Sequence, residues 1–321
     1  MKLFHSLLYP LLGGLFCLSC SDDEQDTGTK QPTTAGEVTF GVDLTGFSTR
    51  VTQDGSSWND GDKIGTYVLD MKTLEPVTEA ANVPYVCSEE GASVSFTSTT
   101  PLKVQNDGTP VKFVAYYPYN ADVRNFNYPV QLAAQERGST ACDLLYAATK
   151  EEYTYSPENE PHISLNFTHR LAKVILKFVN MEKEPLEVSD VRIEGMQTAA
   201  SFNIQTDVLT VDESSVATIN PYHNATTGFY EAIILPSALT DSYKVSFVLD
   251  DREKEWIFTN LDIALPQFHK GYSYTFALYI DDSGFVEMGR LENVEGGNSS
   301  SNIATSLRNC DTSPHFCKKR S

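Results

Sequence analysis

Apolar and polar residues alternate with a period of two along much of this chain. The clearest case is the segment 37–44, in which Val38, Phe40, Val42 and Leu44 alternate with Glu37, Thr39, Gly41 and Asp43. Because successive side chains of a strand point to opposite faces, this alternation predicts a strand that buries one of its faces.

The same reading predicts many more short strands. They are rich in Val, Ile, Thr, Phe and Tyr, and Gly, Pro, Asn and Asp fill the gaps between them. We expect strands at 63–69, 92–97, 112–116, 164–167, 172–180, 187–194, 228–235, 243–249, 255–259 and 272–280. The only helical candidate, 130–134, is too short to pack as a layer. The pattern therefore predicts an all-β protein made of antiparallel β-sandwiches.

Composition divides the chain further. Residues 20–36 contain no large apolar residue after Cys20, which is typical of a flexible acidic tether, and residues 296–321 form a polar tail that we expect to be disordered. The polar, proline-punctuated stretch 149–161 is the best domain boundary. We therefore expect two tandem β-sandwich domains, at 37–155 and 156–295.

The first 24 residues have the order of an export signal. Lys2 is followed by an apolar run to Leu18, and the small residue Ser19 precedes Cys20 and the acidic residues 22–24. This arrangement resembles a bacterial lipoprotein signal, which implies a signal peptide at 1–19, cleavage between Ser19 and Cys20, and a lipid on Cys20. The acidic run resembles the mark that sends such proteins of the Bacteroides group to the outer face of the outer membrane. An ordinary secretion signal with a free Cys20 is the alternative.

Charge and cysteine content limit the possible partners. The formal net charge is −19, so contact with nucleic acid is not expected. Beyond the signal, the cysteines at 87, 142, 310 and 317 form no C-x-x-C pair and no Cys/His cluster, so we expect neither a zinc site nor a redox motif. Export permits disulfides, but the pairing of these four cysteines stays open.

We find no pattern that predicts catalysis. The chain lacks the G-x-S-x-G, H-E-x-x-H, P-loop and G-x-G-x-x-G motifs, so no catalytic residue, metal or cofactor is expected. The loop 54–62 holds three aspartates, but their spacing does not match an EF-hand, and a solvated turn is the simpler interpretation. A carbohydrate-binding surface is a further hypothesis. Its candidate stacking rings are Tyr116, Tyr117, Tyr119, Tyr153, Tyr155 and Trp256, which otherwise cover strand ends.

Five phrases occur in order along the chain: TRVTQDGSSWNDGDKIGTYV (49–68), VKFVAYYPYN (111–120), DLLYA (143–147), FTHRLAKVILKF (167–178) and GYSYTFALYI (271–280). Together they resemble the fimbrillin family of Bacteroides-type bacteria, in particular its fimbrillin-like members. The segment GFVEMGRLENVEGGN resembles the last strand of that family, although it lacks the usual tryptophan. The resemblance implies two transthyretin-like β-sandwiches that assemble with other fimbrial subunits, identical or different, into surface fimbriae.

The resemblance also implies a maturation step. A trypsin-like, Arg-specific protease would cut between Arg50 and Val51 and so remove the strand 37–44, with Val38, Phe40, Val42 and Leu44 as its buried residues. A strand from the region 284–295 of a neighbouring subunit would then fill the vacated groove, and a host glycoprotein or glycan is a further possible partner. The alternative is that Arg50 is a solvent-facing loop residue and that the first strand is permanent.

Overall fold

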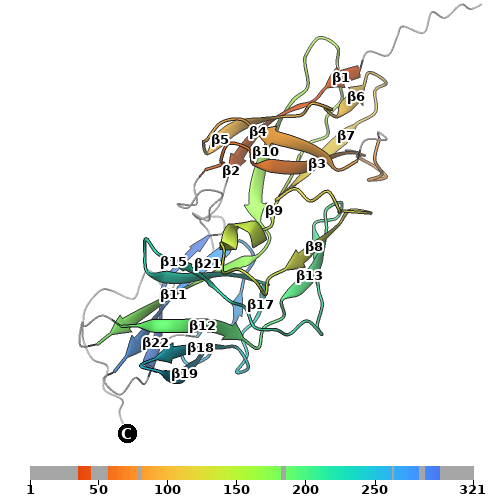
Figure 1. Cartoon of the computed structure of the whole chain (residues 1–321). Coiled ribbons are helices and arrows are strands. Elements are labelled where there is room, and N and C mark those ends of the chain that lie inside the picture. The colour runs from red at the N-terminus through yellow and green to blue at the C-terminus, as the bar shows by residue number, and fades with distance from the viewer. Residues whose placement is uncertain are drawn as a thin grey trace, which may run out of the picture. The chain divides into compact units, whose positions relative to one another are not determined.

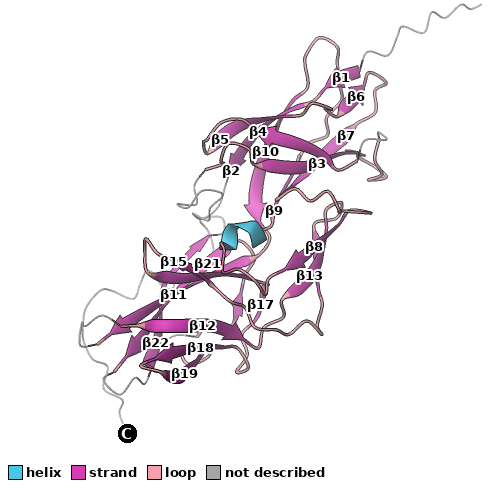
Figure 2. Ribbon diagram, in the orientation of Figure 1, coloured by secondary structure: helices cyan, strands magenta, loops and turns pink. Residues whose placement is uncertain are grey.

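The computed structural model describes residues 35–44, 57–77, 81–181, 186–261, 264–281 and 286–296 (Figure 1). Within these ranges the chain forms strands and one 3-10 helix, η1 (Ser139–Cys142), and contains no α-helix (Figure 2). The all-β prediction is therefore confirmed. None of the described residues belongs to a helix with the length and hydropathy that a membrane span requires.

The first half of the described chain forms a closed barrel. In spatial order its strands are β10 (His162–His169), β2 (Thr39–Leu44), β5 (Ser93–Thr97), β4 (Val83–Cys87), β3 (Lys63–Asp70), β7 (Val111–Tyr117) and β9 (Leu145–Ala148). Large aromatic side chains fill its interior, among them Phe40, Trp58, Tyr85, Phe96 and Phe113. Trp58, which its polar neighbours had suggested to lie in a turn, is fully buried.

Two features of this barrel were not foreseen from the sequence pattern. β10 lies beyond the expected domain boundary, yet it pairs with β2 and β9 and so closes the barrel of the first half. β10 also runs parallel to β2, whereas the pattern predicted antiparallel pairs throughout. A period of two marks a half-buried strand but carries no information about its direction, so the pattern could not predict the parallel pairing.

The second half is a pair of packed sheets. One sheet has the order β15 (Tyr222–Asn224), β16 (Phe229–Ile234), β11 (Ala172–Asn180), β21 (Tyr272–Ile280) and β22 (Val286–Gly296). The other has the order β12 (Val188–Glu194), β18 (Lys244–Leu249) and β19 (Arg252–Ile257). Side chains from both sheets, such as Val174, Phe276, Val245 and Phe247, share one core. β11 and β21 are a second parallel pair.

Smaller sheets complete the described chain. They are β14 (Val208–Val211) with β13 (Ala199–Asn203) and β8 (Asn127–Gln131), β1 (Ala35–Glu37) with β6 (Lys103–Gln105), and β17 (Ser237–Ala238) with β20 (Gln267–Phe268). Residues 130 and 131 of the short helical candidate belong to β8.

A third core cluster joins the two halves. It contains Tyr116 from the barrel together with Phe202 and Ile233 from the second half, and all three are buried. The buried side chain of Gln135 accepts a hydrogen bond from Ile233 N at 2.8 Å and donates one to Ile233 O at 2.7 Å. The described residues accordingly belong to one compact unit, and the division at residues 155–156 stays a prediction.

Candidate functional site

The expected removable strand, 37–44, is divided in the structure. Glu37 ends β1, which pairs with β6, Val38 lies between the two strands, and Thr39–Leu44 forms β2 of the closed barrel. β2 pairs with β5 on one side and with β10 on the other, so its backbone is hydrogen-bonded along both edges. Phe40 has Phe96 of β5 and Ile163 of β10 as its register partners. Figure 1 shows β2, β5 and β10 together in this part of the molecule. Loss of β2 would therefore leave two unpaired strand edges facing one another.

The apolar residues of the alternating pattern are the ones whose side chains are buried. Val38 and Phe40 are 0% exposed, Val42 is 2% exposed, and Leu44 is half-buried against the same core. Phe40 packs edge-on against Tyr85, with ring centroids 4.8 Å apart, and against Phe113 at 5.9 Å. At ~1.5–3 kcal/mol for each fully buried side chain, three such residues contribute roughly 5–9 kcal/mol, which is comparable to the stability of a whole domain.

A buried tyrosine holds the backbone at the start of the strand. The Tyr85 hydroxyl donates to the carbonyl of Val38 at 3.0 Å and accepts from Leu102 N at 2.8 Å. Val38 N in turn donates to the carbonyl of Leu102 at 2.9 Å. Desolvation by burial raises the pKa of Tyr85 to about 12, so the phenol keeps its proton and remains a donor at neutral pH. These hydrogen bonds are made to the backbone at the start of the strand and not to its side chains.

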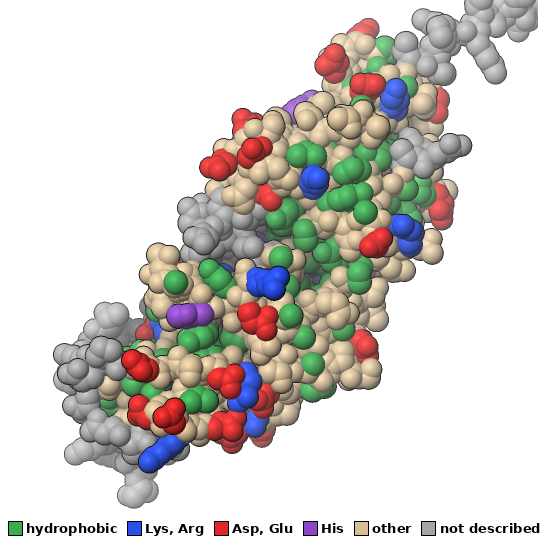
Figure 3. Space-filling view, in the orientation of Figure 1, with side chains coloured by type: hydrophobic (Ala, Val, Ile, Leu, Met, Phe, Trp, Pro, Cys, Tyr) green, Lys and Arg blue, Asp and Glu red, His purple; other side chains and the backbone are tan. Residues whose placement is uncertain are grey.

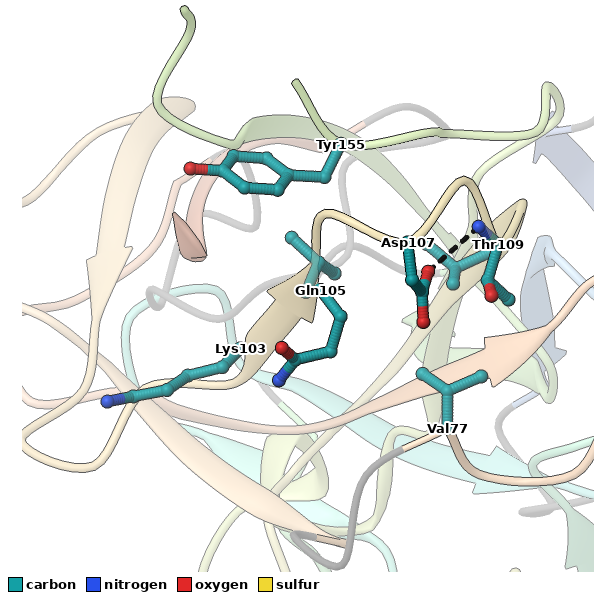
Figure 4. A pocket seen from close by; sticks show the side chains of 8 residues that line it. Val77, Lys103, Gln105, Asp107, Thr109 and Tyr155 are labelled. Carbon is teal, nitrogen blue, oxygen red and sulfur yellow. Dashed lines mark hydrogen bonds between the residues drawn. The ribbon is translucent and has the colours of Figure 1, made fainter. Parts of the chain in front are cut away.

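A cavity lies beside β6, the strand that pairs with β1. Its volume is about 180 Å³, and its lining residues are Val77, Lys103, Val104, Gln105, Asp107, Thr109, Val111 and Tyr155 (Figure 4). Asp107 accepts a hydrogen bond from Thr109 N at 2.9 Å, which lowers the pKa of its carboxyl group. Ligand pockets usually enclose about 300–1,000 Å³, so this cavity does not have the size of a small-molecule site.

Two of the quoted sequence phrases meet in a buried contact between a histidine and an aspartate. Asp143, from the phrase 143–147, lies 2.9 Å from His169 Nδ1, from the phrase 167–178, and both side chains are less than 10% exposed. The next residue, Arg170, pairs with Asp207 at 2.5 Å and lies over the ring of Tyr146 at 4.8 Å. These contacts stabilise the point where the chain passes from the barrel to the second half.

The rings proposed for carbohydrate stacking do not form an exposed platform. Tyr116 is 0% exposed and Trp256 is 2% exposed, and the other four candidates are half-buried. The Tyr117 hydroxyl donates to Asp62 at 3.2 Å. Asp62 also accepts from Asn59 N at 2.7 Å, which supports the polar-turn interpretation of this loop, while residues 54–56 lie outside the described ranges.

The described residues contain no group of three or more His, Cys, Asp or Glu side chains arranged to hold a metal ion. Cys87 and Cys142 are both free thiols, so they do not pair with one another. On the face shown in Figure 3, the Lys and Arg side chains of the described residues are scattered and do not form a patch.

The segment expected to supply a donor strand has a place in its own subunit. β22 pairs with β21 along almost its whole length, and Val286, Leu291 and Val294 are buried in the core of the second half. A Cβ built on Gly289 would lie 2.1 Å from the ring of Trp256, so β22 passes directly against that ring. Donation would require these contacts to be given up.

Four of the predicted site residues lie outside the described ranges, namely Ser19, Cys20, Arg50 and Val51. Cys310 and Cys317 also lie outside them. The signal peptide, the lipid on Cys20 and the cut after Arg50 therefore stay predictions. Of the predicted site, the structure brings together Val38, Phe40 and Val42 in one buried row, with Leu44 at its margin.

The described part of the chain is thus an all-β protein built from a closed barrel and a pair of packed sheets. The chain matches the family described as fimbrillin-like over residues 49–301, which is more than half of its length. It therefore belongs to the fimbrillin-like family. This family suggests a cell-surface fimbrial location and other fimbrial subunits as partners.

Solved structures share this fold. A Bacteroides uniformis protein named for cell adhesion is 22% identical, with a TM-score of 0.63, over 84% of this chain and 97% of that one. A Bacteroides ovatus protein named in the same way is 15% identical, with a TM-score of 0.62, over 84% of this chain and 100% of that one. No curated protein sequence matches the chain.

Proposed function

We propose that this protein is a structural subunit or accessory adhesin of a cell-surface fimbria, assembled by strand addition after cleavage between Arg50 and Val51. The observation that supports this most directly is the position of β2. It lies close to the N-terminal end of the described chain, is bonded on both edges and fills the barrel with Phe40 and Val42, next to Val38 just before it. A strand so placed can be exchanged for one from another subunit without any rethreading of the chain.

Strand addition suits this site for a physical reason. Main-chain hydrogen bonds along β5 and β10 supply strength, and the alternating pockets of the barrel interior fix the register. An empty groove with two open edges would aggregate, so the incoming strand has to arrive as the old one leaves. The family match begins at residue 49, next to the proposed cut, which is consistent with a leader that ends there.

The processing step is tested with Arg50→Ala. We expect this variant to remain a monomeric precursor on cells, whereas Arg137→Ala, an exposed arginine elsewhere, should assemble normally. The measurement is the ladder of detergent-resistant oligomers on gels of unheated cell extracts. A normal ladder from Arg50→Ala would contradict the proposed cut.

The proposal includes a lipid anchor at Cys20, behind the acidic tether at 20–36, on the outer face of the outer membrane. The Cys20→Ser variant should lose membrane retention, because the thioether-forming thiol is gone, while Cys17→Ser should keep it. Fractionation of cells followed by mass spectrometry of the N-terminus gives the answer. Unchanged retention of Cys20→Ser would remove the lipid from the proposal.

The alternative, a surface lipoprotein that captures glycans, has less support. The six rings suggested for it are buried or half-buried, so they offer no adjoining exposed faces for stacking. A host glycoprotein could still be bound by a different surface of an adhesin.

A further inference from the structure

The chain that would fill the groove is constrained by more than its apolar residues. A Cβ built on Gly36 would lie 2.5 Å from Tyr155 Cε2 and 2.7 Å from Pro161 Cγ. Real Cβ atoms do not approach other atoms so closely. Tyr155 is half-buried and packs against the barrel core, and Pro161 is a rigid ring, so neither yields easily. The position of Gly36 therefore accepts only a glycine without rearrangement.

A second glycine, Gly41 in the neighbouring strand β2, is covered less firmly. A Cβ on Gly41 would lie 2.9 Å from His162 Nε2, and His162 Nδ1 is hydrogen-bonded to Thr39 Oγ1 at 3.0 Å. The His162 side chain is exposed, so it can swing away at the loss of that bond. The groove therefore prefers a small residue here but does not demand one.

Between and beside these glycines the groove requires apolar side chains. Phe40 is enclosed by Tyr85 and Phe113, and Val42 has Val94 and Leu165 as its register partners. Val38, Phe40 and Val42 are at most 2% exposed. A charged side chain at any of the three would be taken out of water, which is costly unless it is paired.

We propose that the groove occupied by residues 35–44 selects its incoming strand by a pattern of glycine, any residue, apolar, any residue, large apolar, small, apolar. We propose further that it takes this strand from a different fimbrial subunit and not from a second copy of this chain. The inference rests on the proposed function, since it specifies the partner of that same groove.

This chain's own C-terminal segment shows why a second copy is disfavoured. Without gaps, Gly284, Val286, Met288 and Gly289 fall at the places of Gly36, Val38, Phe40 and Gly41. The match then ends, because Arg290 falls at the place of buried Val42 and Glu292 at that of Leu44. Residues 284–289 thus resemble residues 36–41, which occupy the groove. The next residue, Arg290, would place a charge at the buried position of Val42.

The structure adds an independent reason. Val286 and Leu291 of β22 are already buried in the core of their own subunit, and Lys177 pairs with Glu292 at 2.8 Å. A second copy would have to give up these contacts and bury Arg290 as well. A different subunit with an apolar residue at the position of Val42 avoids the burial of that charge.

The test uses the full chain, cleaved between Arg50 and Val51 and still folded, incubated with fluorescent ten-residue peptides. The first peptide is AGEVTFGVDL (residues 35–44), with its Gly36→Val and Gly41→Val variants. The second is SGFVEMGRLE (residues 283–292), with its Arg290→Val/Glu292→Leu variant. The readout is the fraction of protein that retains each peptide after gel filtration.

We expect the native 35–44 peptide to incorporate, the Gly36→Val peptide to do so about tenfold less, and the Gly41→Val peptide to lose about threefold, because His162 can move. The 283–292 peptide should incorporate about tenfold less than the native peptide, and its Arg290→Val/Glu292→Leu variant should recover most of that loss. In a Tyr155→Ala protein the Gly36→Val peptide should regain part of its binding.

The outcomes separate the two proposals. If the native peptide incorporates but Gly36→Val does so equally well, the glycine rule is wrong while strand exchange stands. If the 283–292 peptide binds as well as the native one, the groove accepts a second copy and the choice of partner is wrong. If the folded, cleaved protein takes up no peptide at all, the proposed function fails and this inference fails with it.

Discussion

β2 and β22 lie near opposite ends of the described chain and have much in common. Each follows a glycine-containing pattern, each carries a glycine beneath an aromatic side chain, and each buries several apolar residues. They differ in their pairing. β2 has a ladder on both edges inside a closed barrel, whereas β22 is the end strand of its sheet, with a full ladder to β21 and a single bridge, from Gly289 to Leu261, on its other side.

This difference indicates which of the two strands would leave a specific binding site if it were removed. Removal of β22 would expose one edge of an open sheet, which any strand could extend. Removal of β2 would open a barrel between two fixed strands, so that only a strand of the right register and shape restores it. An acceptor site with specificity is therefore expected at β2 and not at β22.

The largest expected effect comes from the centre of β2. Phe40→Ala should lower the free energy of unfolding by about 3–5 kcal/mol, because it leaves a cavity between Tyr85 and Phe113. Leu291→Ala in β22 should cost about 2 kcal/mol, since Leu291 lies near the edge of its sheet. Urea unfolding of the uncleaved protein measures both. Equal losses would mean that β22 is held as firmly as β2.

For the glycines of the two strands, Gly41 in β2 and Gly289 in β22, we expect the larger loss of stability in β22. Gly289→Val should destabilise the protein by about 1–3 kcal/mol, because Trp256 is buried and cannot leave. Gly41→Val should cost less than about 1 kcal/mol in the uncleaved chain, where exposed His162 can move aside. Thermal unfolding curves of the two variants compare them directly. A larger loss for Gly41→Val would show that His162 is fixed.

A further expected effect concerns alkaline pH. Burial raises the pKa of Tyr85 in the barrel, and of Tyr274 in the second half, to about 12 in each case, against an ordinary value of ~10. A raised pKa contributes stability that is complete below pH ~10 and is lost as the pH rises toward about 12. Other buried tyrosines act in the same direction, so the measurement is the slope of stability against pH.

Tyr85→Phe should make that slope shallower, and Tyr274→Phe should do the same for the second half. Both variants also lose a hydrogen bond, which shifts stability by a constant that does not depend on pH. Urea unfolding at several alkaline pH values, with tyrosinate absorbance followed in parallel, separates the two effects. An unchanged slope in Tyr85→Phe would mean that its phenol ionises equally easily in the folded and unfolded chain.

Two of the strands that the sequence did not predict, β4 and β8, were missed for the same physical reason. β4 contains Pro84 and β8 contains Pro129, and proline argues against a strand when only the local pattern is seen. β19 was expected at 255–259 but spans Arg252–Ile257, because its first residues are polar and lie in a strand at the end of a sheet. Strands with strong alternation or long apolar runs were located well, such as β11 and β21, whose bounds match the expected ones.

The amino-acid sequence by itself determined the all-β class, the alternation that buries Val38, Phe40 and Val42, and the phrases that indicate the fimbrillin-like family. These are local properties, because side-chain periodicity and turn residues act over a few positions. Only the tertiary structure decided that β10 closes the barrel parallel to β2, that Trp58 is core, and that Tyr155 and His162 cover the glycines of β1 and β2. Those facts depend on residues more than 100 positions apart in the chain, whose pairing no local pattern specifies.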